Sequence, residues 1–270
     1  MRYALDVQYK GKNYAGSQIQ FGGKCKENPQ GIQVESTIQG EIEKALSTLI
    51  IGGKSAKNKD RQVKTIFSGR TDKGVNALGQ VIHFDYDKDI VASDFIYHMN
   101  EILPDDISVN NLRIVPNGFH AQKSAKSRYY KYEFINRRYK QAFDGDIPRV
   151  KFKINIERMQ KALNYLLGEH NFSSFKSSGT LNPSKVCILT RAEVKKQGDR
   201  VFIHIEGNRF LYNMVRTIVG TLLEIEGHNL PAEHMKEVLE ACDRRKAGQT
   251  VSPYGLTLRR VDYSHVNCES

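Results

Sequence analysis

Alternating apolar and polar positions predict four strands in the first part of the chain. Residues 3–9 alternate as a half-buried strand does, and the segment 63–67 follows the same pattern. A longer run, GQVIHFDY at 79–86, predicts a third strand, and a fourth is expected near 107–114. We expect these strands to belong to one lobe.

Helical spacing of apolar residues predicts two helices between these strands. The apolar residues of 34–49 recur at helical spacing and stop before a glycine pair. A shorter helix around 93–102 ends before Pro104. The polar, glycine-bearing stretch 10–33 is expected to be a long loop. Residues 1–115 are therefore predicted to form an N-terminal α+β lobe.

The second part of the chain repeats this order of elements. RYYKYEFIN at 128–136 predicts a strand in which aromatic and basic residues alternate, and a helix is expected near 155–167. The other predicted elements are strands near 186–195 and 200–206, an apolar helix from Phe210 to Ile225, a helix that starts near Pro231 and a closing strand at 256–263. Residues 116–270 are predicted to form a second lobe.

The repeated order predicts the fold class. We expect an α+β protein of two pseudo-equivalent lobes, with mainly antiparallel sheets and flanking helices. A length of 270 residues is enough for two such lobes. Lobes of this kind would place a binding cleft between their sheets.

The charge of the chain points to a polyanionic partner. Lys and Arg total 41 against 30 for Asp and Glu, a formal net charge of +11, which favours phosphate contacts. We find no long apolar span and no basic amphipathic helix rich in bulky apolar residues, so a membrane role is disfavoured. A DNA-binding regulator ranks last, because no helix-turn-helix, zinc-finger or basic-zipper pattern is present. Nucleic acid is therefore the leading candidate for the partner.

The N-terminus and the cysteines indicate the compartment. MRYALDVQYKGKNYAG is polar by its sixth residue and lacks the apolar core of a secretory signal. The four cysteines, Cys25, Cys187, Cys242 and Cys268, lie far apart and form no pair or cluster of metal-binding spacing. We expect a cytoplasmic protein with no structural zinc.

The segment SGRTDKGVNALGQ at 68–80 is the first candidate for chemistry. Its glycines allow tight backbone geometry around an Arg-Thr-Asp core, and residues two apart in an irregular loop can project toward a common space. Arg70 could therefore pair with Asp72. From spacing alone, however, a solvated Asp-Lys-Gly turn is the simpler interpretation.

A resemblance gives this segment a function. GRTDKGV at 69–75 resembles the signature of the tRNA pseudouridine synthase A family, in which its Asp is catalytic. Other segments are similar to the family in the same order: YKGKNYAG at 9–16, FHAQKSAKSRYYKYEF at 119–134, GNRFLYNMVRTIVGTLLEIEG at 207–227 and AGQTVSPYGLTL at 247–258. The resemblance implies an RNA pseudouridine synthase, an isomerase that needs no metal or organic cofactor.

Two departures from the family pattern are visible. Asn76 stands where many members have His, and the early loop from Phe21 to Gly31 is longer than usual. Neither change removes a catalytic group. Because Asn is still a hydrogen-bonding residue, we expect these changes to affect which RNA is selected rather than the chemistry.

The resemblance also implies the roles of four residues. Asp72 would attack the target nucleoside or its base, so that the glycosidic N–C bond breaks and a C–C bond forms after the base rotates. A nearby arginine would keep this carboxylate charged, and Arg70 and Arg216 are the candidates. Tyr130 would stack on the flipped base and is a candidate to assist proton transfer.

Further residues are candidates for RNA contacts. We expect Arg216 to share a helical face with Arg209, Tyr212, Asn213 and Gly220, although periodicity alone would also fit a solvated polar stripe. The other candidates are Lys123, Lys126, Arg128, Tyr132, Phe210 and His120. Without the resemblance, the aromatic residues would be ordinary strand or core residues and the cations a solvated run.

The implied substrate is tRNA, with uridines 38–40 of the anticodon arm as targets and a homodimer as the assembly. A paralogue that acts on ribosomal RNA is the first alternative. A noncatalytic RNA-binding or RNA-folding protein is the second, since basic α+β lobes with aromatic strands also suit that role. The combination of Arg70, Asp72, Tyr130 and Arg216 argues against the second alternative, because a pure binder would not need it.

Overall fold

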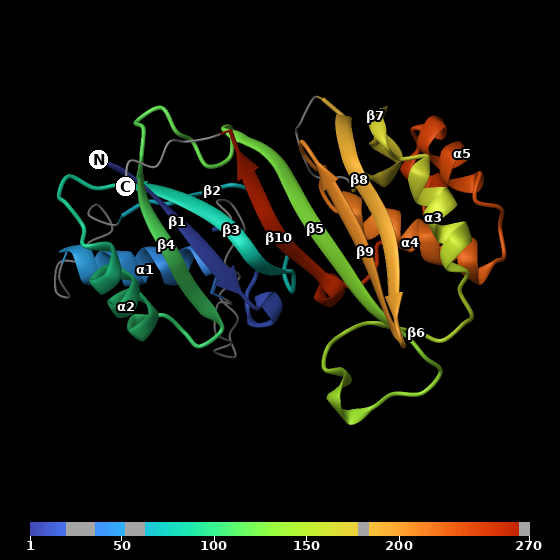
Figure 1. Cartoon of the computed structure of the whole chain (residues 1–270), viewed down its shortest axis with the longest axis horizontal. Coiled ribbons are helices and arrows are strands. Elements are labelled where there is room, and N and C mark those ends of the chain that lie inside the picture. The colour runs from blue at the N-terminus through green and yellow to red at the C-terminus, as the bar shows by residue number, and fades with distance from the viewer. Residues whose placement is uncertain (20–35, 52–62, 178–183, 265–270) are drawn as a thin grey trace, which may run out of the picture. The chain divides into compact units, whose positions relative to one another are not determined.

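The computed structural model describes residues 1–19, 36–51, 63–177 and 184–264. Within these ranges the chain forms two compact units. Unit 1 comprises Met1–Ala125 together with the segment that begins at Tyr263, and unit 2 comprises Lys126–Asp262 (Figure 1). No helix in the described ranges is long and apolar enough to cross a membrane.

Unit 1 is a four-stranded antiparallel sheet with two α-helices. Its strand order is β4-β1-β3-β2. The elements in chain order are β1 (Arg2–Tyr9), the 3-10 helix η1 (Gly11–Asn13), α1 (Ile38–Ile51), β2 (Ile66–Phe67), β3 (Asn76–Asp85), α2 (Ala92–Ile102) and β4 (Ile107–Val115). The helices α1 and α2 contact each other (Figure 1).

The core of unit 1 follows from the strand register. In the pairing of β1 with β3, Tyr3 lies opposite Phe84 and Leu5 opposite Ile82, and all four side chains are buried. The next pair in this row joins Val7 to Gln80. Gln80 is therefore a polar side chain at a core position, where it is fully buried.

Unit 2 contains a second set of mainly antiparallel strands. Its strand order is β10-β5-β9-β8-β7, with the short β6 parallel to β5. The strands are β5 (Ala125–Asn136), β6 (Arg149–Val150), β7 (Gly168–Asn171), β8 (Val186–Gln197), β9 (Arg200–Gly207) and β10 (Leu256–Tyr263). The helices are η4 (Ala142–Asp144), α3 (Ile156–Asn164), η5 (Ser173–Phe175), α4 (Met214–Gly227), α5 (His234–Ala241), η6 (Arg244–Lys246) and η7 (Pro253–Gly255).

The two units share one topology. Unit 1 runs β1-α1-β2-β3-α2-β4, and unit 2 runs β5-α3-β8-β9-α4-β10 once its additional short elements and α5 are set aside. Their strand orders also correspond, β4-β1-β3-β2 with β10-β5-β9-β8. Each unit is thus a β-α-β-β-α-β fold. The prediction of an α+β protein with two pseudo-equivalent lobes is confirmed.

The structure corrects the expected boundary between the lobes. Residues 116–125, which the sequence analysis assigns to the second lobe, belong to unit 1. The reason is that Phe119 and Ala121 are buried against Ala4 and Val115. The backbone carbonyl of Ala121 also accepts a hydrogen bond from Tyr263 at 2.8 Å.

Three details of the second unit also differ from prediction. The apolar helix α4 begins at Met214 rather than Phe210, because Asn213 has a φ of 61°, which asparagine tolerates but a helix does not. The helix expected to start near Pro231 begins at His234. The short strands β6 and β7 were not predicted, since two to four residues carry no readable alternation. The long loop 21–31 lies outside the described residues.

Candidate active site

The family-signature loop connects β2 to β3 in unit 1. It spans residues 68–75, and Asp72 is half-buried on it. Asp72 forms an isolated antiparallel bridge with Gly16, and its carbonyl accepts the backbone N–H of Val75 at 3.1 Å. Ser17 extends this contact: its backbone N–H donates to the Thr71 carbonyl at 3.0 Å, and its hydroxyl accepts the Thr71 N–H at 2.8 Å. The loop backbone is therefore fixed on both sides of Asp72.

Two glycines of the segment YKGKNYAG, Gly11 and Gly16, allow this segment to lie close to the backbone of the loop 68–75. A Cβ on Gly11 would lie 2.1 Å from the carbonyl oxygen of Val75, so only glycine fits there. Gly16 has a φ of +126°, a conformation that side chains rarely adopt. The Gly11 N–H donates to the side-chain oxygen of Asn76 at 2.9 Å. Asn76, the departure from the family pattern, thus helps to hold the loop.

Buried polar side chains support the loop from the core side. Gln80 donates to the carbonyl of Gly69 at 3.0 Å and accepts the Ser68 hydroxyl at 2.5 Å. Its amide also donates to the hydroxyl of Tyr9 at 3.3 Å, which in turn lies 2.7 Å from the Thr71 hydroxyl. Burial raises the pKa of Tyr9 to about 12, so this phenol is neutral in the physiological range. The core position of Gln80 is explained by its role as an anchor for the loop.

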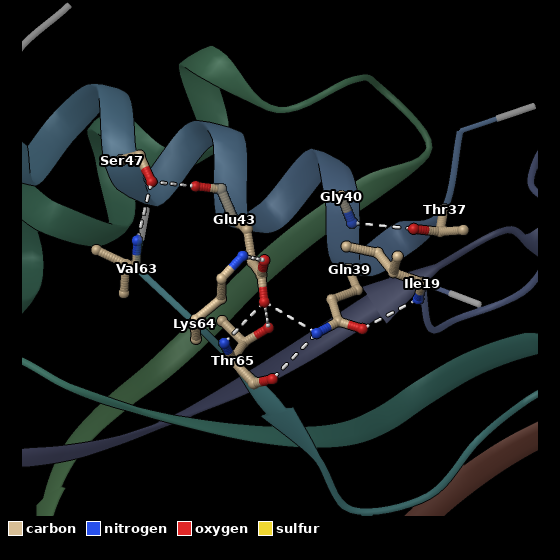
Figure 2. Close-up of polar contacts among 9 residues, drawn as sticks. All are labelled: Ile19, Thr37, Gln39, Gly40, Glu43, Ser47, Val63, Lys64 and Thr65. Carbon is tan, nitrogen blue, oxygen red and sulfur yellow. Dashed lines mark hydrogen bonds and ion pairs between the residues drawn. The ribbon is translucent and has the colours of Figure 1, made fainter. Parts of the chain in front are cut away.

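A second polar cluster, on α1, holds the chain just before β2 and the chain just after Ser17 (Figure 2). Glu43 of α1 is buried and accepts both the backbone N–H of Thr65, at 2.8 Å, and its hydroxyl, at 3.1 Å. Gln39, one turn earlier, donates to Glu43 at 2.9 Å and to the Thr65 carbonyl at 3.1 Å. Its amide oxygen accepts the backbone N–H of Ile19 at 3.1 Å. Helix α1 therefore ties the chain before β2 to the chain after Ser17.

Arg70 is the exposed member of the loop. Its Nε donates to the side-chain oxygen of Gln18 at 2.5 Å. Gln18 therefore holds the guanidinium of Arg70 from the segment that follows Gly16. Gln18 follows directly on Ser17, so the segment that braces the backbone of the loop also orients this guanidinium.

Arg216, the second candidate arginine, lies in the first turn of α4 in unit 2. Its Nε donates to the carbonyl of Val251 at 2.8 Å, and its Nη1 donates to the side-chain oxygen of Asn213 at 2.8 Å. Asn213 is fixed in turn, since its amide donates to the Ser177 hydroxyl at 3.0 Å. Because α4 begins only at Met214, Arg209 and Tyr212 do not share its helical face as expected.

The segment AGQTVSPYG, residues 247–255, supplies the carbonyl group that holds Arg216. It packs directly on α4, where a Cβ on Gly220 would lie 1.7 Å from the carbonyl oxygen of Gln249. The Gly248 N–H donates to the Thr221 hydroxyl at 3.0 Å. This close approach brings the Val251 carbonyl within reach of Arg216. The glycine of the helix is therefore required by packing.

The strand β5 presents the two candidate tyrosines. Tyr130 is 9% exposed, and its ring meets Phe210 edge to face at a centroid distance of 5.0 Å. Tyr132 is 1% exposed, and its hydroxyl donates to the Ser252 carbonyl at 3.0 Å. Burial raises the pKa of Tyr132, against the opposing charge of Arg216. Tyr132 therefore supports the segment that holds Arg216.

The remaining candidates differ in their environment. Arg128 donates to the carbonyl of Asn208 at 2.8 Å, and Arg209 donates to that of Ser184 at 3.4 Å. Lys123 and Lys126 are exposed. The Nδ1 of His120 accepts backbone N–H groups within its own turn, and burial lowers the pKa of its ring. His120 therefore stabilises a turn.

The structure thus groups the candidates by unit. Arg70 and Asp72 share one braced loop in unit 1. In unit 2, Tyr130 contacts Phe210 in the chain before α4, and Arg216 lies in the first turn of α4. The bracing residues were missed from the sequence: Tyr9, Gly11, Gly16, Ser17, Gln18 and Gln80. No cluster of three or more His, Cys, Asp or Glu side chains suited to a metal ion occurs in the ranges that the structure describes.

Comparison with known proteins identifies the family. A family model described as tRNA pseudouridine synthase matches residues 162–264. A tRNA pseudouridine synthase A of Brevibacillus brevis is 38% identical over 95% of this chain and 97% of its own length. Proteins of the same name from Anoxybacillus flavithermus and Bacillus subtilis are 37% and 36% identical, each over 98% of this chain. The chain belongs to the tRNA pseudouridine synthase A family.

Proposed function

We propose that this chain isomerises uridine to pseudouridine in tRNA, with Asp72 as the catalytic carboxylate. Family membership over nearly the whole chain supports the activity and the class of RNA. The observation that carries the assignment of Asp72 is the bracing of its loop by Gly16 and Ser17. A side chain on a fixed backbone can meet a substrate without first losing conformational freedom.

The reaction is balanced within the nucleoside. The bond from the ribose C1′ to N1 of uracil breaks and a bond from C1′ to C5 forms. The proton on C5 leaves to solvent and N1 gains one, so nothing is oxidised or reduced. Asp72 would act as the nucleophile, either at the sugar or at the base.

Three residues would assist Asp72 in this proposal. Arg70 and Arg216 would supply positive charge that keeps the carboxylate ionised. Arg216 is preset for a fixed role because both Asn213 and the Val251 carbonyl hold its guanidinium. Tyr130 would stack on the flipped uracil, and the edge of Phe210 braces its ring.

The finer parts of the proposal concern target and assembly. We assign uridines 38–40 of the anticodon arm as the targets, the cytoplasm as the place of action and a homodimer as the assembly. The family resemblance is the support for each of these. The names of the relatives do not favour ribosomal RNA.

Tritium release tests this function directly. Purified full-length protein is incubated with unmodified tRNA that carries tritium at C5 of uridine. We expect release from tRNA with uridines at 38–40 and a loss of release when these are replaced by cytidine. Release from ribosomal RNA but not from tRNA would overturn the target, and release from neither, together with tight binding, would favour the noncatalytic RNA-binding alternative.

A further inference from the structure

A second ordered loop, residues 137–148, leaves the end of β5 in unit 2 and carries no residue assigned to the reaction. At its apex, in η4, the side chain of Phe143 is 97% exposed. It is the most exposed large apolar side chain in the described ranges. Tyr139 of the same loop is 64% exposed. Two solvent-exposed aromatic side chains on one loop indicate a binding surface.

The loop is held in this conformation by one arginine. The Nη2 of Arg137 donates to both carboxylate oxygens of Asp144 at 2.6 Å, and its Nε donates to the Tyr139 carbonyl at 3.0 Å. Its Nη1 donates to Asp199, in the turn between β8 and β9, at 3.1 Å. Asp144 also accepts the backbone N–H of Gln141 at 2.8 Å. Because Asp144 is fixed, its neighbour Phe143 is fixed in an outward position.

Exposed cations lie within the loop and directly after β6. The pairing of Ile135 with Arg149 and of Asn136 with Val150 brings the two ends of the loop side by side. Residues 137–153 include one exposed acidic residue, Asp146, and four exposed cations: Arg138, Lys140, Lys151 and Lys153. Asp199, which is also exposed, is paired with Arg137. The loop therefore combines an aromatic ring with a local excess of positive charge.

We infer that this loop is a second RNA-binding element, in which Phe143 stacks on an unpaired base and the exposed cations bind phosphates. Base stacking on an aromatic ring together with a cationic surface is how proteins hold single-stranded RNA. Lysine is depleted at protein–protein interfaces, and three of the four cations are lysines. The charge thus favours RNA over a protein partner. The inference rests on the proposed function in that the RNA is the substrate.

Substitution of Phe143 tests the stacking. Phe143→Ala should raise the KM for tRNA about tenfold, the effect of one stacked base, and leave kcat unchanged. Phe143→Tyr keeps an aromatic face and should keep the wild-type KM. Tyr97→Ala removes an aromatic ring that is 62% exposed in unit 1 and serves as the control. A fully exposed side chain makes few folding contacts, so the unfolding midpoint should not move.

A second measurement addresses the phosphates. Replacing Lys151 and Lys153 together with Gln should lower the slope of log Kd against log salt by about two for tRNA binding. An unchanged KM for Phe143→Ala, or an unchanged salt slope, would overturn the inference. So would a mass that falls on Phe143→Ala substitution in light scattering, since that result assigns the loop to a protein interface.

The design separates this inference from the function itself. If wild-type protein releases no tritium from tRNA, the proposed function fails. Equilibrium binding of the same tRNA to wild type and to Phe143→Ala still decides the inference. Equal Kd values would reject it, and a tenfold weaker Kd for the variant would support an RNA-binding loop on a protein of another function.

Discussion

The two units share a topology but differ at one corner. In unit 1 the connection from β2 to β3 is an eight-residue loop, 68–75, that carries Asp72. In unit 2 the corresponding connection from β8 to β9 is the two-residue turn Gly198-Asp199, with Gly198 at a φ of +56°. The chain thus contains the same framework twice and the family-signature loop once.

Both corners are braced by residues at or after the end of the unit's first strand. In unit 1, Gly16 and Ser17 bind the loop at Asp72 and Thr71. In unit 2, the backbone N–H of Asn136 donates to the Asp199 carbonyl at 2.7 Å, next to the contact of Arg137 with the Asp199 carboxylate. We infer from this difference that the shared framework supplies rigidity, while the longer loop of unit 1 carries the residue proposed for the chemistry.

The largest effect on kcat is expected when the carboxylate of Asp72 is removed. Asp72→Asn should lower kcat roughly 10³-fold or more, because it removes the nucleophile. Asp199→Asn, at the equivalent corner, is the matched control and should change kcat less than about twofold. Rates of tritium release from tRNA measure both. Equal losses in the two variants would break the comparison.

Displacing the loop should have the next largest effect. Gly11→Ala places a Cβ 2.1 Å from the Val75 carbonyl oxygen, so the loop must move. Such a displacement of about 1 Å should lower kcat on the order of 10²-fold. Gly118→Ala has open space around the new Cβ and should leave kcat unchanged. Full activity of Gly11→Ala would show that the loop position is not critical.

Removal of the Tyr9 hydroxyl tests whether the buried side chains of unit 1 anchor the loop 68–75. Tyr9→Phe removes the bond to Thr71 and a partner of Gln80, which should lower kcat about tenfold and stability by about 1–3 kcal/mol. Tyr3→Phe is the control on the same strand, since its hydroxyl donates to the Lys88 carbonyl far from the loop. It should lower stability without a change in kcat. Equal kcat values for the two variants would contradict the anchoring role of Tyr9.

The smallest effect on turnover is expected at the outer cluster of Figure 2. Glu43→Ala leaves the Thr65 N–H and hydroxyl without their acceptor, which should cost about 3 kcal/mol of stability. The kcat of the folded variant should stay within about threefold, because Ser17 and Gln80 still hold the loop. Lys44→Ala, on the exposed side of α1, should change neither value. Urea unfolding and tritium release give the two readouts.

Periodicity predicted most of the framework. The helical spacing in 155–167 reflects burial on one face of α3, whereas the residues from Gln80 to Phe84 in the predicted strand 79–86 are buried on both faces. The start of α4 could not be predicted from spacing, because the left-handed backbone of Asn213 interrupts an apolar run. The shift of residues 116–125 to unit 1 depends on the packing of Phe119, which is a tertiary contact.

The bracing of the loop was less visible in the sequence. Tyr9, Gly11 and Gln80 lie far from Asp72 along the chain or look like ordinary strand residues. One signal was present: Gln80 has the same phase as Ile82 and Phe84, which places a polar side chain on the buried face. A buried amide needs partners, so this phase alone could have marked Gln80 as an anchor.

The most direct test of the central claim is a transcriptome-wide map of pseudouridine in cells with and without the gene. The deletion is complemented either with wild type or with Asp72→Asn. We expect the anticodon-arm sites of tRNA to vanish in the deletion, to return with wild type and to stay absent with Asp72→Asn. Return of these sites with Asp72→Asn, or their persistence in the deletion while ribosomal RNA sites are lost, would contradict the account.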